Sequence, residues 1–434
     1  MTFSARSPQS ADRSAPGVDG ARLLSRWQAV PLAIGSIAGS GILFLPSAVY
    51  VQSGANSILV WVLATVMCVP MLLMFQDMVR DNPGGDGIEA FIRAGLGDTL
   101  GRCVPVMFLS LVIVGLPAGA LVAGRYATQA LGGGAGVQTL AALAVLVAAL
   151  ATNLAGVRAS TRLQHAAVWA LVAMAVVLIG SAMPGAGDHL PALHPHLTHL
   201  GLLLPGVGLA FWAFAGFENL TFLSGQFRNP RRDLLPVGVI ALVVYGVLTV
   251  LLTVAIAVSI PRGQVDSVTG LLQLAGRTRM RGLLVGAVAV IAFGAMVLNA
   301  VAWVWGVSRL VAAAGRTAIL PRPLASTTGD GVPRRALGLL GVLFLVTGGV
   351  LVAFPALLVD ALAATSGIFI LLYALSIVSY ARVRGLTLRT ALNAPPLVLL
   401  VATLVESGWR SVYGLVALAV AVASQLVVRR RRRA

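Results

Sequence analysis

The sequence predicts an all-α membrane protein with about 12 transmembrane helices. Hydrophobic residues make up 58% of the 434 residues, charged residues make up only 10%, and the mean hydropathy is +0.93. Soluble globular domains carry much more charge, so this composition excludes them. A helix needs about 20 apolar residues to cross ~30 Å of hydrocarbon. Apolar runs of that length therefore mark the spans.

Twelve apolar runs have a suitable length. They lie near 29–50, 57–79, 104–128, 137–155, 163–183, 201–225, 234–260, 282–312, 335–354, 356–382, 391–405 and 411–428. Residues 1–28 are rich in Ser, Ala, Pro and Arg and are predicted to be a disordered cytoplasmic tail. The remaining segments are a membrane core over 29–390, helices 11 and 12 over 391–428, and a basic cytoplasmic tail over 429–434.

The arginines predict the orientation in the membrane. Every one of the 31 basic residues is arginine, and positive charge accumulates on cytoplasmic loops. With the N-terminus inside, 25 arginines fall on cytoplasmic segments and 6 on the other side. We therefore expect both termini in the cytoplasm of a cell whose inner membrane holds the protein. The loop 261–281 is the exception, because it places four arginines outside.

The net charge of +17 belongs to this cytoplasmic surface. Anionic lipid headgroups are its expected partner, and no nucleic-acid partner is expected. Cys68 and Cys103 fall in or beside apolar spans, so we expect neither a disulfide framework nor a zinc site. The sequence predicts no cofactor.

The first span contains residues that interrupt a helix. The stretch AIGSIAGSGILFLP, residues 33–46, places Gly39 and Ser40 near the middle of the bilayer. Irregular backbone is tolerated at that depth only where it lines a protein or water cavity. The alternative is a small-residue packing face that includes Gly35 and Gly39. Contiguous Gly-Ser-Gly followed by Pro46 is more disruption than packing requires, which favours a break.

A second interruption lies five spans later. The sixth span contains FWAFAGFENL, with Gly216 and Glu218 near mid-membrane. Because five is odd, a repeat of five helices re-enters the membrane from the opposite side, which gives an inverted 5+5 repeat with discontinuous helices 1 and 6. In such folds the substrate lies between the broken helices. Helix N-termini attract an anionic group and unwound carbonyls attract a cation, so a zwitterionic amino acid suits the site.

Several motifs resemble the amino acid-polyamine-organocation transporters. They are GSIAGSGILFLP in the first span, FWAFAGFENLTFLSGQFRNPRRDLLPVGV from the sixth span onward, NPGGDGIEAFIRAGLGDTLGR, LNAVAWVWGVSRLVAAAGRTAILPRPLA and VPRRAL. The segments FLSLVIVGLPAGAL and SGIFILLY are similar to bacterial exporters of methionine and branched-chain amino acids. The resemblance implies the LeuT-like form of the 5+5 repeat and covers most of residues 29–385.

This resemblance implies the substrate-binding residues. The Ser40 hydroxyl and the Gly41 N–H would hold the substrate carboxylate. The carbonyls of Ile37, Trp212 and Ala215 would receive its ammonium group. Trp212 would also act as a gate that closes over the substrate side chain, although an interfacial aromatic anchor is the alternative.

Coupling to an ion rests on fewer residues. Glu218 is the acidic residue deepest in a span, where an ionised side chain costs at least ~2.5–3.5 kcal/mol on insertion scales. It is either a proton-linked group or a structural hydrogen-bonding group. Asn299 in the eighth span is a candidate polar pocket residue or an interhelical hydrogen bond. The lysine-free fifth span and the lack of a Ser/Thr pair in the eighth leave proton coupling or exchange as the expected mechanism.

The expected activity is alternating-access export of methionine, leucine, isoleucine and valine. The apolar pocket candidates Ile113, Leu116 and Ile368 favour hydrophobic amino acids, and the export direction is what the resemblance implies. The alternatives are an importer or exchanger with another substrate, and a nutrient sensor with the same site. A membrane-embedded enzyme is not expected, because Glu218 has no acidic companion at its depth. A 6+6 transporter would place equivalent features six spans apart. The histidines of 188–200 lack helical metal-site spacing, so no metal site is predicted.

Overall fold

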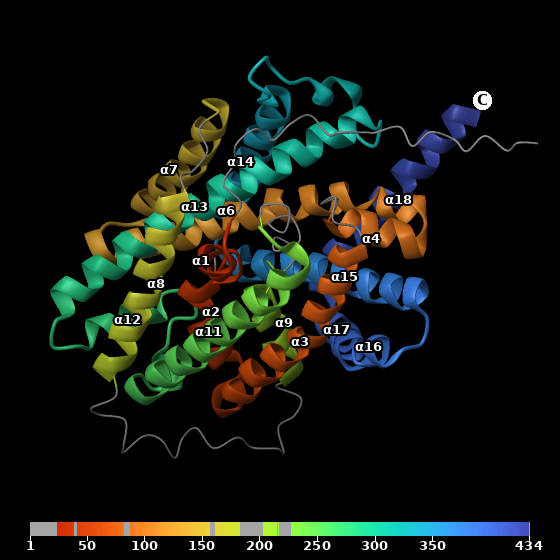
Figure 1. Cartoon of the computed structure of the whole chain (residues 1–434). Helices are drawn as coiled ribbons and strands as arrows, with labels where there is room; N and C mark the ends of the chain where they lie inside the picture. The colour runs from red at the N-terminus through yellow and green to blue at the C-terminus, as the bar shows by residue number, and fades with distance from the viewer. Residues whose placement is uncertain are drawn as a thin grey trace, which may run out of the picture.

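The protein is almost entirely helical. Its computed structural model describes residues 24–38, 41–81, 87–156, 161–182, 203–214, 216 and 227–433. The first half contains α1 (Arg26–Ala38), α2 (Gly41–Ser53), η1 (Gly54–Asn56), α3 (Ser57–Asp81), α4 (Gly87–Leu96), α5 (Asp98–Gly101), α6 (Val104–Leu131), α7 (Ala135–Leu154), α8 (Thr161–Ala182) and α9 (Leu203–Phe214). The second half contains α11 (Pro230–Ser259), η6 (Arg262–Gln264), α12 (Gly270–Gly276), α13 (Arg281–Arg316), η7 (Arg322–Ala325), α14 (Arg334–Ala353), α15 (Leu357–Arg384), α16 (Leu388–Ala391), α17 (Ala394–Glu406) and α18 (Trp409–Arg433) (Figure 1).

Ten stretches of the described chain are long and apolar enough to cross a membrane. One of them, Gly41–Asp81, joins α2 to α3, and α9 is a shorter apolar helix outside these ten. The prediction of an all-α, multi-pass membrane protein is confirmed at this level.

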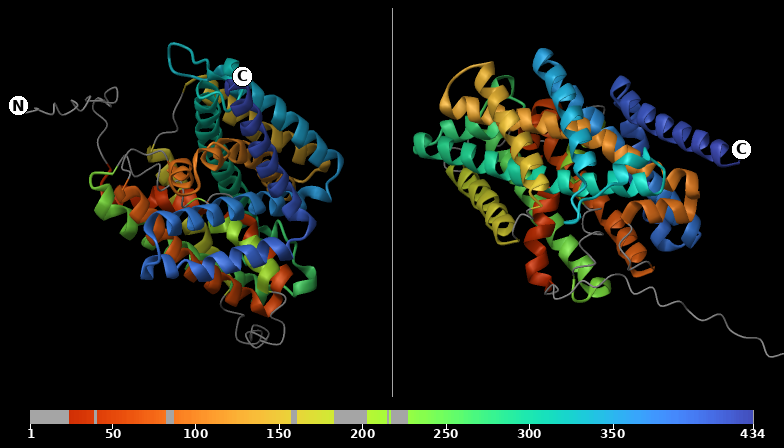
Figure 2. Two further views of the ribbon diagram at one scale, coloured as in Figure 1. Left: turned by 90° about the vertical axis from the view of Figure 1, so that its right-hand side faces the viewer. Right: turned by 90° about the horizontal axis from the view of Figure 1, so that it is seen from above.

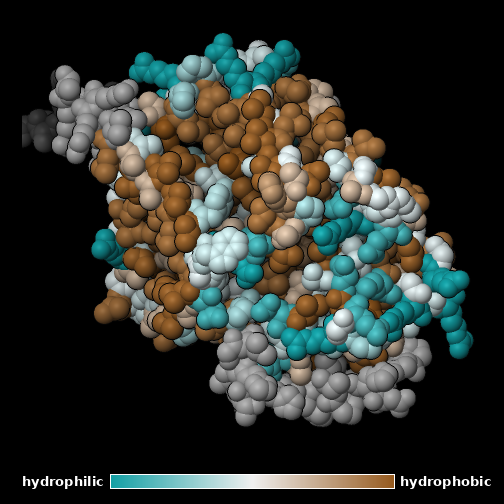
Figure 3. Space-filling model, turned by 180° about the vertical axis from the view of Figure 1, so that it is seen from behind, coloured by the Kyte–Doolittle hydropathy of each residue, from teal (hydrophilic) through white to brown (hydrophobic). Residues whose placement is uncertain are grey.

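The outer surface explains why so many apolar residues are tolerated. Large side chains such as Val62, Leu140, Leu283, Val346 and Val405 are exposed. Figure 3 shows apolar residues over the upper and left parts of one face, with hydrophilic residues along its top edge and from its middle across the lower right. Hydrocarbon rather than water is the solvent that matches such a surface.

Small residues allow the helices to approach closely. A Cβ on Gly124 of α6 would lie 2.3 Å from the Gln138 carbonyl oxygen of α7, and one on Gly119 would lie 2.4 Å from Met296 of α13. Because lipid gives no hydrophobic drive between helices, van der Waals packing through small residues stabilises the bundle.

One end of the bundle collects the segments predicted to be cytoplasmic. Leu24 forms an isolated parallel bridge with Phe227, and Arg26 pairs with Asp233 of α11 at 2.9 Å. Arg80 at the end of α3 donates to the Arg231 carbonyl at 3.3 Å. These contacts join the starts of α1 and α11 to the end of α3.

The opposite end uses arginines as helix caps. Arg262 donates hydrogen bonds to the carbonyls of Val51 at 2.8 Å and Gln52 at 3.1 Å, both in the last turn of α2. Arg277 donates to the Ser259 carbonyl at 2.7 Å, which ends α11. Cations at helix C-termini satisfy unpaired carbonyls and oppose the helix dipole. Two of the four arginines that violate the charge rule in loop 261–281, Arg262 and Arg277, therefore stabilise helix ends.

The C-terminal helix is longer than the predicted span. Helix α18 continues through the arginines 429–433, where the sequence predicts a separate basic tail. Its end extends away from the rest of the bundle (Figure 2).

Candidate functional site

Helix α1 ends just before the Gly-Ser-Gly segment, and helix α2 begins at the last residue of that segment. Helix α1 ends at Ala38, and α2 begins at Gly41. The last carbonyls of α1 and the first N–H groups of α2 lack partners within their own helices. Ile37 lies in the last turn of α1. Opposite partial charges therefore lie close together along this part of the chain.

Helix α9 ends at the second predicted interruption. Its last residue is Phe214, and Gly216 adopts a φ of +139°, a conformation that favours glycine. Trp212 lies in the final turn, so its carbonyl is among those without a partner within α9.

The two interrupted regions meet at Gly41. A Cβ on Gly41 would lie 3.3 Å from Cα of Ala213 in α9 and 3.1 Å from the hydroxyl oxygen of Tyr245 in α11. Helices α1, α2 and α9 are mutual neighbours, and α11 packs along both α1 and α2 (Figure 1). We call the meeting point of Gly41, Ala213 and Tyr245 the helix junction.

Aromatic rings surround the helix junction. Phe44 of α2 lies against Trp212 of α9 with ring centroids 5.2 Å apart. Phe214 packs edge-on against Tyr245 at 5.5 Å and against Trp61 of α3 at 6.1 Å. Such aromatic pairs add to the free energy of packing beyond the buried area.

Trp61 fixes this aromatic group to the neighbouring helices. Its indole N–H donates to Oγ1 of Thr253 in α11 at 2.8 Å, and both residues are fully buried. Phe214, which packs against the Tyr245 ring, is therefore connected through Trp61 to both α3 and α11.

Two of the predicted binding residues, Gly41 and Trp212, have both a described backbone and a described environment. Gly41 is at the helix junction. Trp212 is partly buried and packs against Phe44, which lies one turn after Gly41 in α2. Ile37 is described as backbone of α1. Ser40, Ala215 and Glu218 lie outside the described residues, so their predicted roles remain predictions.

Asn299 lies in α13, a helix that packs mainly against elements other than α2, α9 and α11. It is partly buried on α13, whose principal neighbours are α6, α7, α8 and α12. A different asparagine makes an interhelical hydrogen bond, because Asn153 of α7 donates to the Val301 carbonyl of α13 at 3.1 Å. The role of Asn299 in a polar pocket remains a prediction.

Sequence reasoning did not select Phe44, Phe214 or Tyr245. Each is an aromatic residue in an apolar span, and nothing in the local sequence distinguishes it from a core residue. The signal that identifies them is spatial, because they come from three helices and meet at one point.

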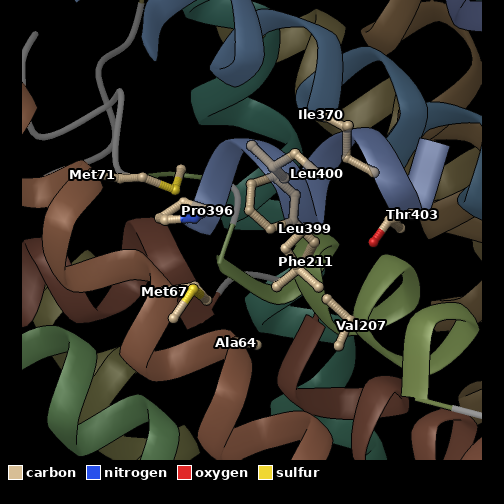
Figure 4. A pocket seen from close by; sticks show the side chains of 10 residues that line it. All are labelled: Ala64, Met67, Met71, Val207, Phe211, Ile370, Pro396, Leu399, Leu400 and Thr403. Atoms are coloured by element: carbon tan, nitrogen blue, oxygen red, sulfur yellow. The ribbon is translucent and has the colours of Figure 1, made fainter. Parts of the chain in front are cut away.

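A small apolar crevice lies elsewhere. Figure 4 shows it between α3, α9, α15 and α17, lined by Met67, Phe211, Leu399 and other apolar side chains, with the Thr403 hydroxyl at one side. Its lining shares α9 with the helix junction but includes neither Gly41 nor Tyr245.

The helices and their ends define a multi-pass helical membrane protein with a buried meeting point of helix termini. The profile of the amino acid permease family matches residues 24–422. The chain therefore belongs to the amino acid permease family, within the amino acid-polyamine-organocation superfamily, a family of transporters rather than enzymes.

Characterised and uncharacterised relatives agree with this family. The chain is 27% identical over 208 residues to the L-methionine/branched-chain amino acid exporter YjeH of Escherichia coli, which covers 48% of this chain and 49% of that protein. It is 23% identical over 405 residues to the branched-chain amino acid permease BcaP of Lactococcus lactis, which covers 86% and 85% respectively.

A third relative is an uncharacterised amino acid permease, YecA of Bacillus subtilis, at 25% identity over 213 residues, or 49% of this chain and 50% of that protein. The matches to YjeH and YecA span about half the length of those relatives.

Proposed function

We propose that this protein is a secondary active transporter that exports neutral hydrophobic amino acids across the inner membrane by alternating access, with protons as the coupling ion. The substrates are methionine, leucine, isoleucine and valine. The observation that carries this proposal is the helix junction, where the N-terminus of α2 lies against the last turn of α9.

The helix ends at this junction suit a zwitterion. The free N–H groups at the start of α2 attract a carboxylate, and the final carbonyls of α1 and α9 attract an ammonium group. Both poles lie within reach of one small molecule, since a Cβ on Gly41 would lie only 3.3 Å from the Ala213 Cα. Ser40 and Gly41 then hold the carboxylate, and Ile37, Trp212 and Ala215 receive the ammonium group.

The described side chains around the junction favour an apolar substrate side chain. Phe44, Phe214 and Leu45 are almost fully buried there, and Trp212 packs against Phe44. An aromatic and aliphatic lining strengthens binding of apolar groups by burial and does not compensate a buried charge. Trp212 is the gate in this proposal.

The element order supports twelve crossings. If α1 and α2 form one interrupted crossing and α9 begins another, then α3, α6, α7, α8, α11, α13, α14, α15, α16 with α17, and α18 supply the remainder. The interrupted crossings are then the first and the sixth. This order fits the LeuT-like 5+5 inverted repeat.

Proton coupling rests on the sequence, because the fifth span (α8) has no lysine and the eighth span (α13) has no Ser/Thr pair. A Cβ on Gly35 of α1 would lie 2.6 Å from Cγ2 of Val168 in α8, so these two helices pack closely at an apolar contact. Gly35 thus has the packing role that was the alternative interpretation of the glycines in this span. We assign the proton to Glu218.

The two ends of the bundle support the proposed orientation. Segments with many arginines meet one another at the end that contains Arg26, Arg80 and Arg231. This end would face the cytoplasm and anionic lipid. The export direction rests on the resemblance to the methionine and branched-chain exporters.

Counterflow in proteoliposomes tests the proposal. Vesicles are loaded with unlabelled methionine, leucine, arginine or glutamate, and entry of labelled methionine is measured without sodium at two pH gradients. Internal methionine and leucine should accelerate entry, arginine and glutamate should not, and the rate should depend on the proton gradient. Acceleration by arginine or glutamate would contradict the substrate class.

A pair of substitutions connects this activity to the site. Ser40→Leu should abolish counterflow, because it removes the hydroxyl and crowds the junction. The matched control Ser326→Leu, on the exposed loop after η7, should retain counterflow. Normal transport by correctly inserted Ser40→Leu protein would remove Ser40 from the binding site.

A further inference from the structure

Tyr245 has a buried hydroxyl that no described residue satisfies. The side chain is fully buried on α11, and its hydroxyl oxygen has no hydrogen-bond partner in the described part of the chain. A buried hydroxyl without a partner costs free energy, and native proteins rarely retain one without a reason. A ligand that completes the hydrogen bond is one such reason.

The hydroxyl points at a place that attracts anions. It lies 3.1 Å from the position a Cβ would take on Gly41, the first residue of the 13-residue helix α2. The N–H groups of this first turn have no partner within their helix, and the helix dipole is positive at this end. A phenol O–H beside these groups adds another donor to the same site.

Another buried tyrosine shows the contrast. Tyr126 of α6 is also fully buried, but its hydroxyl donates to the Leu43 carbonyl of α2. The packing of the protein therefore satisfies one tyrosine hydroxyl at α2 and leaves the other free at the beginning of the same helix.

We propose that the Tyr245 hydroxyl donates a hydrogen bond to the carboxylate of the transported amino acid at the N-terminus of α2. This inference rests on the proposed amino acid transport and adds a substrate-binding residue from α11 to it. An O–H donor to an ionised carboxylate forms a short, strong hydrogen bond, which satisfies the hydroxyl only when substrate is bound.

The test compares two tyrosine-to-phenylalanine variants of the full-length protein. Tyr245→Phe keeps the ring that packs against Phe214 and removes the free hydroxyl. Tyr413→Phe removes a hydroxyl that donates to the Ser110 carbonyl at 2.6 Å, between α18 and α6. The two variants make the same chemical change, but only one loses a hydrogen bond of the ligand-free protein.

Thermal unfolding in detergent separates a ligand role from a structural one. Without ligand, Tyr245→Phe should unfold at the wild-type temperature or above it, while Tyr413→Phe should unfold at a lower temperature. Added methionine should raise the unfolding temperature of wild type and Tyr413→Phe, and much less that of Tyr245→Phe. The inference is overturned if Tyr245→Phe lowers the ligand-free temperature and keeps the full methionine shift.

Transport kinetics identify the group on the substrate. Tyr245→Phe should raise the KM for methionine about tenfold or more with little change in maximum rate. Methioninamide, which has a neutral amide in place of the carboxylate, should compete equally poorly in both proteins. An equal loss of affinity for methionine and methioninamide would overturn the carboxylate contact.

The wild-type protein distinguishes this inference from the proposed function. If wild type exchanges methionine and Tyr245→Phe has the same KM, the inference fails and the transport proposal stands. If wild type exchanges none of the tested amino acids, both fail.

Discussion

Gly41 is the residue at which the two interrupted helices come together. It begins α2, faces Ala213 of α9 and lies beside the Tyr245 hydroxyl. A larger residue could be accommodated at Leu45 or Tyr245 by a side-chain shift, but Ala213 Cα belongs to a helix backbone. The absence of a side chain at Gly41 therefore sets the distance between α2 and α9.

Gly41→Ala should raise the KM for methionine about tenfold while the protein still inserts. The added methyl group would lie 3.1 to 3.3 Å from three neighbours, and overpacking of this kind costs about 1–3 kcal/mol. Counterflow kinetics give the measurement. Gly286→Ala is the matched control, because Gly286 is in α13 with nothing within 4 Å of its Cβ position. An unchanged KM in Gly41→Ala would show that α2 and α9 do not form the binding site together.

The position of the first interruption was predictable from sequence, whereas the aromatic neighbours were not. Gly-Ser-Gly in an apolar run predicts a break at Gly39 and Ser40, and α1 and α2 flank these two residues. Glycine acts locally, through its own backbone freedom. Phe44, Phe214 and Tyr245 acquire a role only when three distant helices pack together, so composition and periodicity could not identify them.

Helix α3 is tied to the last third of the chain at its arginine-rich end. Asp77 is almost fully buried, accepts a hydrogen bond from the Tyr380 hydroxyl of α15 at 2.6 Å, and pairs with Arg389 of α16. Asp81, one turn later, pairs with Arg384 at 2.6 Å, and its carboxylate is much more exposed than that of Asp77. From the sequence alone, Asp77 lies near the end of a span, where a charged residue at the membrane interface is expected. Its partners are more than 300 residues away and could not be inferred from spacing.

Asp77→Asn should lower the free energy of unfolding by about 1–3 kcal/mol, because it leaves the buried Tyr380 hydroxyl and the Arg389 guanidinium without an ionised acceptor. Asp81→Asn is the matched control and should cost about 0–1 kcal/mol, as expected for a solvent-exposed ion pair. Thermal unfolding of the two purified variants under one set of conditions gives the comparison. Equal losses in the two variants would mean that burial of Asp77 adds nothing to the stability of this end.

The whole molecule has two chemically different ends, and composition alone identifies most of this organisation. The apolar surface and the helices follow from 58% hydrophobic residues and from the need to satisfy every backbone group in lipid. The charge rule assigns the loops to two sides with one exception, 261–281. The structure accounts for two of the arginines in that loop, because Arg262 and Arg277 bond to carbonyls at the ends of α2 and α11. Arg262 and Arg277 stabilise helix ends, so the need to satisfy these carbonyls explains their positions where the charge rule does not.

The orientation can be tested with two cysteines placed at opposite ends of the bundle. Gly263 in η6 and Gly329 after η7 are both exposed, and a Cβ at either position would meet nothing within 4 Å, so both substitutions should fold. In intact cells a membrane-impermeant maleimide should label Gly263→Cys and not Gly329→Cys, and permeabilisation should expose Gly329→Cys. Cys68 and Cys103 are buried, so the wild-type protein provides the background. Labelling of Gly329→Cys alone in intact cells would reverse the orientation. Arg262 and its neighbours would then lie in the cytoplasm, and the larger group of arginines would face outward against the charge rule.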